Sequence, residues 1–208
     1  MILDEAVLKA RCIDFLLSRQ RNGELTIINE LPYADGTRRA DLVSVDEKLH
    51  AFEIKSDVDR LSRLDNQVSD YRAGFDYISV VTTTKHLSKV RYSQSRYVGV
   101  ILVEENKITE LRKPTPFRRF DKYLQTTMLD VKSISELIRS QKLAIPENFR
   151  AYEKRNLLAS TMSQTELHEH VRQTLKKKYH QRFEIFMKHR GEVTLVDDIP
   201  LLGDLNVL

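Results

Sequence analysis

The sequence predicts an α/β protein with a sandwich core of order α-β-β-β-α-β-α-β over residues 1–113 and a mainly helical module over residues 114–208. Three observations predict this class. Apolar residues recur at helical spacing in two early segments, whereas β-branched residues cluster in short strand-like runs. Prolines at positions 114 and 116 then end the strand-like part. A hairpin joined to further strands through helical crossovers is typical of an α/β sandwich.

The first four elements form the beginning of this core. In the segment Asp4–Gln20, apolar residues return every three or four positions, which predicts an amphipathic helix. Three strands are expected after it, at residues 25–31, 39–45 and 49–55. The dipeptide Asp35-Gly36 marks the turn between the first two strands.

The remaining elements alternate and then become helical. A helix is expected at Arg60–Phe75, and two apolar strands, at residues 77–82 and 97–103, flank a short helix at residues 85–92. Beyond Pro114 we expect helices at residues 133–143 and 147–158. A longer helix should begin at Ser163, which forms a capping box with Glu166, and end near Gly191 as its C-cap.

Composition excludes several classes of protein. A chain of 208 residues with 41% hydrophobic and 31% charged residues can bury an ordinary core, so disordered and fibrous classes are excluded. The single cysteine, Cys12, excludes an internal disulfide and favours a reducing compartment. The longest apolar run is far shorter than a membrane span. We therefore expect a soluble, cytoplasmic protein without a targeting segment.

Positive charge is concentrated in the second part of the chain. Residues 1–113 are balanced, so the net charge of +4 comes entirely from residues 114–208. The segment from Arg172 to Arg190 contains seven Lys and Arg residues but only one acid, Glu184. Such a run could contact a phosphate backbone, or it could be an ordinary solvated helix face. The candidate phosphate ligands are Lys176, Lys177, Lys178 and Arg182.

The segment most informative about chemistry is the second predicted hairpin. If residues 46–48 form its loop, Val45 pairs with Leu49, Val43 with Ala51 and Asp41 with Glu53. Two carboxylates directly opposite each other destabilise a sheet unless something neutralises them, and a divalent cation would do so. Lys55 lies on the same strand face as Glu53 because strand side chains alternate. The alternative is an exposed hairpin with ordinary surface ion pairs.

This arrangement suits metal-assisted phosphodiester hydrolysis. Carboxylate oxygens favour Mg²⁺, with Mn²⁺ as a substitute. Asp41 and Glu53 would hold the ion, which would acidify a bound water, and Lys55 would orient that water or stabilise the phosphorane oxyanion. No Gly-rich phosphate loop or nucleophile elbow is present in the sequence.

The residues Asp41, Glu53, Ile54 and Lys55 resemble the signature of the PD-(D/E)XK nuclease superfamily, with Ala40 where the motif has proline. Together with Gln67 and Tyr71, which match a Gln-x-x-x-Tyr element, the segment over residues 1–112 resembles small bacterial RecB-like nucleases. The resemblance implies a restriction-endonuclease-like αβββαβ core.

The resemblance also implies roles for individual residues. It places Asp41, Glu53 and the backbone carbonyl of Ile54 on the metal, and adds Gln67 and Tyr71 to the catalytic set. Glu5 on the first helix is a candidate further ligand, and Glu30 competes with it. The alternatives are that the helix dipole alone favours Glu5 in the first turn and that Glu30 pairs with Arg39 across the hairpin. Arg39 itself is a candidate phosphate contact.

Three functions follow as hypotheses. The first is an Mg²⁺-dependent nuclease that acts on DNA. The second is a catalytically silent nuclease-fold protein that binds nucleic acid or serves as an adaptor. The third is the same enzyme acting on RNA, because metal-assisted cleavage of either polymer uses the same residues. The sequence leaves open whether the protein forms a homodimer or binds a protein partner.

Overall fold

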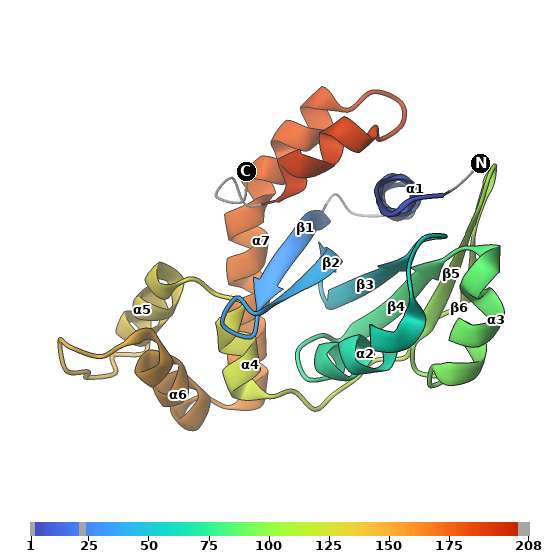
Figure 1. Ribbon diagram of the computed structural model, residues 1–208. Helices are drawn as coiled ribbons and strands as arrows, with labels where there is room; N and C mark the ends of the chain where they lie inside the picture. The colour runs from blue at the N-terminus through green and yellow to red at the C-terminus, as the bar shows by residue number, and fades with distance from the viewer. Residues whose placement is uncertain (1–2, 21–23, 204–208) are drawn as a thin grey trace.

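The computed structural model describes residues 3–20 and 24–203 and is a mixed α/β structure built on one open sheet (Figure 1). The strands are β1 (Thr26–Tyr33), β2 (Arg38–Val45), β3 (Leu49–Lys55), β4 (Tyr77–Thr82), β5 (Gly99–Glu104) and β6 (Lys107–Arg112). The helices are α1 (Glu5–Ser18), α2 (Leu64–Arg72), α3 (Thr84–Ser93), α4 (Lys122–Thr127), α5 (Val131–Ser140), α6 (Ala151–Thr161) and α7 (Gln164–His189). Two 3-10 turns, η1 (Leu61–Arg63) and η2 (Val196–Leu202), complete the described part.

The six strands lie in the sheet in the order in which they occur along the chain. The pairs β1–β2, β2–β3 and β5–β6 are antiparallel, whereas β3–β4 and β4–β5 are parallel. Each parallel pair needs a crossover, and α2 and α3 supply them. The carboxyl end of β3, which carries Glu53 and Lys55, therefore lies in the interior of the sheet beside β4.

Helices cover both faces of the sheet. On one face α1 packs over Phe52 and Ile54 of β3, and on the other α2 packs through Leu64, Val68 and Tyr71. The C-terminal helices lie at the β1 edge, where α7 runs alongside β1 (Figure 1). This arrangement follows from the alternating strand pattern, which gives each face its own apolar side chains.

Side chains on either side of Pro114 share the hydrophobic core. Tyr33 of β1 belongs to the same buried cluster as Leu175 of α7, and Phe52 belongs to the same cluster as Phe186. The described strands all end before Pro114, as predicted. The boundary at residue 114 thus separates a strand-rich part from a helical part that packs against it.

Several predicted elements are confirmed, and others are corrected. The strand Leu49–Lys55 and the capping box of Ser163 with Glu166 are as predicted. The predicted order omitted strand β6, because it is a charged edge strand that packs on one side only and shows little apolar character. It also omitted α4 and η2, which are too short to show a periodic pattern.

The expected C-cap at Gly191 is wrong. Helix α7 ends at His189, and Arg190 is the C-cap in an extended conformation, with φ −65° and ψ 142°. No left-handed residue is therefore needed there. The predicted helix Arg60–Phe75 is shorter than expected, because it begins with η1 and ends at Arg72.

None of the described helices is both long enough and apolar enough to cross a membrane.

Candidate metal and phosphodiester site

A pocket of about 400 Å³ opens where the first half of β2 leaves β3. The predicted register is confirmed for Val45–Leu49 and Val43–Ala51, but pairing ends at Leu42–Phe52. Asp41 and Glu53 are therefore not ladder partners, and that part of the register prediction is wrong. The strands separate at this point, and the opening between them is lined by Glu5, Asp41, Glu53, Ile54, Lys55, Asp59, Arg60, Ser62, Arg63 and Gln67.

Glu53 forms the buried floor of the pocket and is fully shielded from solvent. Lys55 Nζ donates to its Oε1 at 2.6 Å, and the Tyr71 hydroxyl donates to its Oε2 at 2.7 Å. Burial raises the pKa of Glu53 above its ordinary value, although Lys55 and Tyr71 act in the opposite direction. Burial and the nearby Glu53 also raise the pKa of Tyr71, so its hydroxyl stays protonated as a donor. The predicted placement of Lys55 on the same face as Glu53 is thus observed, and Tyr71, expected in the catalytic set, contacts Glu53.

Asp41 forms the wall opposite Glu53. Its Oδ2 accepts a hydrogen bond from the Ile54 amide at 2.8 Å, which fixes the carboxylate against β3. Burial, and next the charge of Glu53, raise the pKa of Asp41 to about 7, against the effects of the Ile54 amide and Lys9. Two buried carboxylates with raised pKa values in one pocket are typical of a functional site, and a bound cation would favour their charged forms.

A second group of acids adjoins Asp41. Carboxylate oxygens of Glu5, Glu30 and Asp41 lie within 4.8 Å of one another. Lys9 of α1 forms an ion pair with Glu5 at 2.8 Å and another with Glu30. Burial disfavours the ammonium form of Lys9, but the hydrogen bonds to Glu30 and Glu5 outweigh it and leave its pKa above the ordinary value.

Glu30 is placed in this group by an irregularity in β1. Its φ of 57° lies in the left-handed region, which costs a residue other than glycine about 1–2 kcal/mol. The β1–β2 pairing is interrupted there, between Asn29–Leu42 and Leu31–Ala40. The second oxygen of Glu30 pairs with Arg39 Nε at 3.2 Å, which is the cross-hairpin bridge that we considered as an alternative.

Gln67 and Tyr71, one helical turn apart, play different parts. Tyr71 is buried against Glu53, whereas Gln67 lines the pocket. The Oε1 atom of Gln67 is buried without a hydrogen-bond partner among the described residues. A buried acceptor of this kind is uncommon and calls for a donor, such as an ion-bound water.

The donor set suits a hard divalent cation. Asp41 and Glu53 offer carboxylate oxygens, and Ile54, whose backbone carbonyl is the third expected ligand, lines the same pocket. Mg²⁺ and Mn²⁺ prefer oxygen ligands of these kinds. The unpartnered Gln67 oxygen agrees with a missing donor at this place. The residues therefore fit such an ion.

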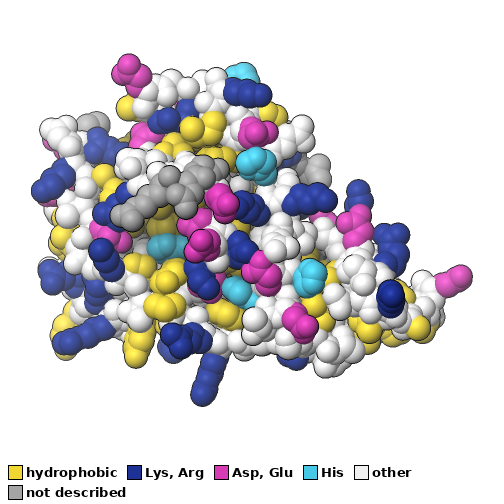
Figure 2. All heavy atoms as spheres, turned by 180° about the vertical axis from the view of Figure 1, so that it is seen from behind, with side chains coloured by type: hydrophobic (Ala, Val, Ile, Leu, Met, Phe, Trp, Pro, Cys, Tyr) yellow, Lys and Arg dark blue, Asp and Glu magenta, His cyan; other side chains and the backbone are white. Residues whose placement is uncertain are grey.

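The predicted phosphate ligands on α7 lie apart from this pocket. We call Lys176, Lys177, Lys178 and Arg182 the α7 cations. Lys176 pairs with Glu24 at 3.2 Å, Lys178 pairs with Asp130 at 3.3 Å, and Arg182 donates to the backbone of Gly203. Seen from behind, Lys and Arg side chains are interspersed with Asp and Glu (Figure 2). Their role in nucleic-acid binding stays a prediction.

Sequence reasoning missed three basic residues of the site. Lys9 could have been suspected from its position four residues after Glu5, which places both on one helix face. Arg60 and Arg63 lie between β3 and α2 and are exposed at the mouth of the pocket. Two arginines soon after the Glu-Ile-Lys segment were the available signal.

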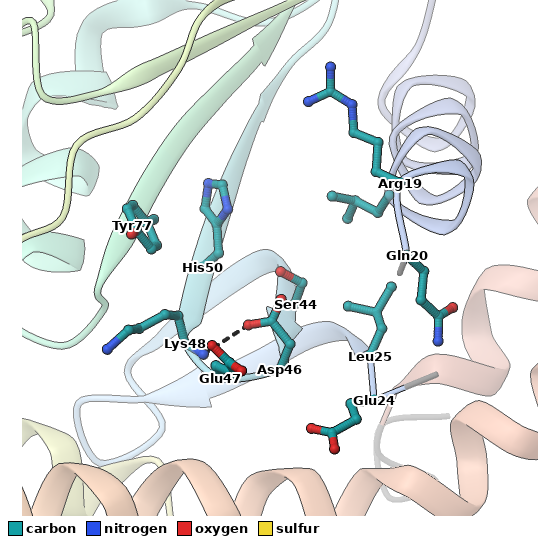
Figure 3. A pocket seen from close by; sticks show the side chains of 11 residues that line it. Arg19, Gln20, Glu24, Leu25, Ser44, Asp46, Glu47, Lys48, His50 and Tyr77 are labelled. Carbon is teal, nitrogen blue, oxygen red and sulfur yellow. Dashed lines mark hydrogen bonds between the residues drawn. The ribbon is translucent and has the colours of Figure 1, made fainter. Parts of the chain in front are cut away.

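A larger pocket of about 470 Å³ lies at the opposite end of β3 (Figure 3). His50 lies in it and donates to or accepts from Ser79 Oγ at 2.9 Å. Burial lowers the pKa of His50 to about 3, so the ring is neutral near pH 7. Asp46, also in this pocket, accepts a hydrogen bond from the Lys48 amide in the β2–β3 turn. The acids among the described residues that line this pocket, Glu24, Asp46 and Glu47, are exposed, whereas Glu53 of the first pocket is fully buried.

Comparison with known proteins gives a family but no chemistry. Residues 2–203 match the family model described as bacteriophage P4 protein cII. Protein cII of Enterobacteria phage P4 is 28% identical over 208 residues, which covers 97% of this chain and 78% of that protein. A solved structure, the SPO1766 protein of unknown function from Silicibacter pomeroyi, is 12% identical with a TM-score of 0.40 and covers 68% of this chain and 94% of its own. The chain belongs to the bacteriophage P4 protein cII family.

Proposed function

We propose that this protein is a metal-dependent nuclease that hydrolyses phosphodiester bonds in DNA. The single observation that carries the proposal is the geometry around Glu53, a fully buried carboxylate held by Lys55 and Tyr71 in the same pocket as Asp41. We further infer that the sheet and its helices belong to the restriction-endonuclease-like fold. The order of β1, β2 and β3, followed by α2 and β4, supports that inference.

Asp41, Glu53 and the backbone carbonyl of Ile54 would hold Mg²⁺, or Mn²⁺ in its place. When bound, the ion would acidify a water and offset the charge that develops on the phosphorus oxygens. Each carboxylate oxygen has a second lone pair, so the bonds from Lys55 and Tyr71 leave Glu53 able to bind the ion. Burial raises the pKa of both acids, and a bound dication would favour their charged forms.

The other residues of the pocket position the reacting groups. The Lys55 ammonium, fixed on Glu53, would orient the attacking water or stabilise the pentacovalent oxyanion. Tyr71 holds the second oxygen of Glu53 and so fixes the carboxylate plane. Gln67 presents a buried oxygen with which the attacking water could form a hydrogen bond.

Positive residues at the mouth make a polyanion the natural substrate. Arg60 and Arg63 lie exposed beside the acids, and Arg39, two residues before Asp41 on β2, is exposed beside Glu30. Guanidinium groups bind phosphate oxygens well because their donors match in geometry. A phosphate chain could thus approach a pocket whose floor is acidic.

The test is cleavage by the purified protein of single- and double-stranded DNA and RNA, with Mg²⁺, Mn²⁺ or EDTA. We expect cleavage of DNA with either metal and none with EDTA. Cleavage of RNA alone would show that the substrate is RNA instead of DNA and would leave the proposed metal-dependent hydrolysis unchanged. Binding of nucleic acid without cleavage under any condition would contradict the proposal and favour a catalytically silent binding protein.

A further inference from the structure

Lys9 is a buried cation within the acidic surroundings of the proposed site. It lies on α1 between Leu8 and Ala10, and only 6% of its surface is exposed. Removing an ammonium group from water is costly unless it is paired. At this position, between buried apolar neighbours, Lys9 therefore depends on its acidic partners.

The partners of Lys9 are two of the three acids that lie together. Its Nζ lies 2.8 Å from Glu5 Oε1 and also forms an ion pair with Glu30 Oε1. Arg39 Nε takes the other oxygen of Glu30 at 3.2 Å. Both oxygens of Glu30 are thus engaged by cations of the protein itself.

These contacts affect the number of ions that the site can hold. Without the ammonium, oxygens of Glu5, Glu30 and Asp41 within 4.8 Å of one another would form a second oxygen-lined cation site beside Asp41. The ammonium lies between Glu5 and Glu30, and its positive charge opposes the binding of a second cation at that place. Asp41, in contrast, has the Ile54 amide as its donor, and Glu53 lies on its other side.

The backbone at Glu30 supports a dedicated role for this contact. A left-handed φ of 57° in the middle of a strand is unfavourable for a glutamate and persists only where the surroundings impose it. The same irregularity interrupts the β1–β2 pairing opposite Asp41. Backbone strain at the ion pair indicates that the position of Glu30 is built into the fold.

We propose that Lys9 is an internal counter-ion that keeps Glu5 and Glu30 from binding a metal and so limits the site to one divalent cation, held by Asp41 and Glu53. The inference rests on the proposed function and adds the number of ions used. The acids outside the single-ion site are neutralised by the protein.

The test is the number of Mn²⁺ ions bound per chain, measured by titration calorimetry and by the electron paramagnetic resonance signal of free Mn²⁺. The wild-type protein should bind one ion. Lys9→Met should bind two, because the released carboxylates of Glu5 and Glu30 join Asp41. Lys9→Arg, which keeps the charge, should bind one.

A matched control uses the same helix. Arg19, the C-cap of α1, pairs with Glu110 at 2.7 Å, so Arg19→Met also removes a cation from a glutamate but leaves the acids beside Asp41 unchanged. It should bind one ion. The double variant Lys9→Met with Glu30→Gln should return to one ion, because the second site loses a carboxylate.

The wild-type count and one further variant decide the question even if Lys9→Met fails to fold. Two ions on the wild-type protein would overturn this inference and leave the proposed nuclease intact. No ion would instead refute the metal site of the proposed function. Glu30→Gln should keep one ion with affinity within about twofold, and loss of binding in that variant would show that Glu30 is a ligand and overturn the inference.

Discussion

Tyr71→Phe removes one hydroxyl whose 2.7 Å hydrogen bond supports a fully buried carboxylate. A hydrogen bond to a charged group contributes about 1.5–3 kcal/mol, and one pKa unit corresponds to about 1.4 kcal/mol. Because the bond lowers the pKa of Glu53, its loss should remove that free energy from the charged carboxylate and raise the pKa further. Metal binding requires the carboxylate, so the acidic limb of the pH profile should move to higher pH.

The assay is Mn²⁺ affinity and cleavage rate as functions of pH, with the melting temperature measured in parallel. Tyr33→Phe is the matched control. Tyr33 is buried in the same hydrophobic cluster as Tyr71, with 6.0 Å between the two ring centroids, and it makes no hydrogen bond to Glu53. It should leave the pH profile unchanged. If Tyr71→Phe gave the same pH profile as wild type, the assignment of Tyr71 as the support of Glu53 would be refuted.

Three further predictions follow from the same pocket and from α7. Lys55→Ala should abolish cleavage and leave nucleic-acid affinity within a few fold of wild type, because the Lys55 ammonium acts in the transition state. A purified variant that cleaves as well as wild type would exclude a catalytic role for Lys55. In the metal-free protein the pKa of Asp41 is raised to about 7, so the folded state holds a proton that the unfolded state has lost above about pH 4. Stability should therefore fall from pH 4 to pH 7, by up to about 4 kcal/mol, and Asp41→Asn should flatten this slope in urea unfolding; an unchanged slope would contradict the shift. Replacing the four α7 cations with Gln should flatten the slope of log affinity against log salt concentration by about 0.9 per lost duplex contact. The total loss should correspond to fewer than four contacts, because three of these residues have partners in the protein. An unchanged slope would show that this helix face is solvated surface that does not contact nucleic acid.

The sequence was informative where the signal is local. The strand Leu49–Lys55 alternates and is flanked by turn residues, so its bounds and the shared face of Glu53 and Lys55 could be predicted. The cap at Ser163 follows from four consecutive residues. The resemblance of the Glu-Ile-Lys segment to nucleases added Tyr71, whose contact with Glu53 is observed.

The rest depends on tertiary contacts that no local pattern contains. The end of β2–β3 pairing at Leu42–Phe52 creates the pocket, yet both strands alternate beyond that point. The left-handed backbone of Glu30 brings it to Lys9, and a glutamate in a strand gives no sign of this conformation. Strand β6 is recognisable only from its pairing with β5. It is an edge strand whose two faces are not both buried, so its sequence lacks the apolar pattern of an interior strand.

The central claim is that Asp41 and Glu53 bind a divalent cation that this protein uses to cleave nucleic acid. The most direct measurement compares cleavage of DNA by the wild-type protein and by Asp41→Asn in Mn²⁺, with the Mn²⁺-induced rise in melting temperature recorded for both. We predict cleavage and a rise in melting temperature for the wild type, and neither for the variant, although its metal-free form should be as stable as wild type or more so. Equal cleavage by both proteins, or an equal Mn²⁺-induced stabilisation, would contradict the claim and place the cation elsewhere.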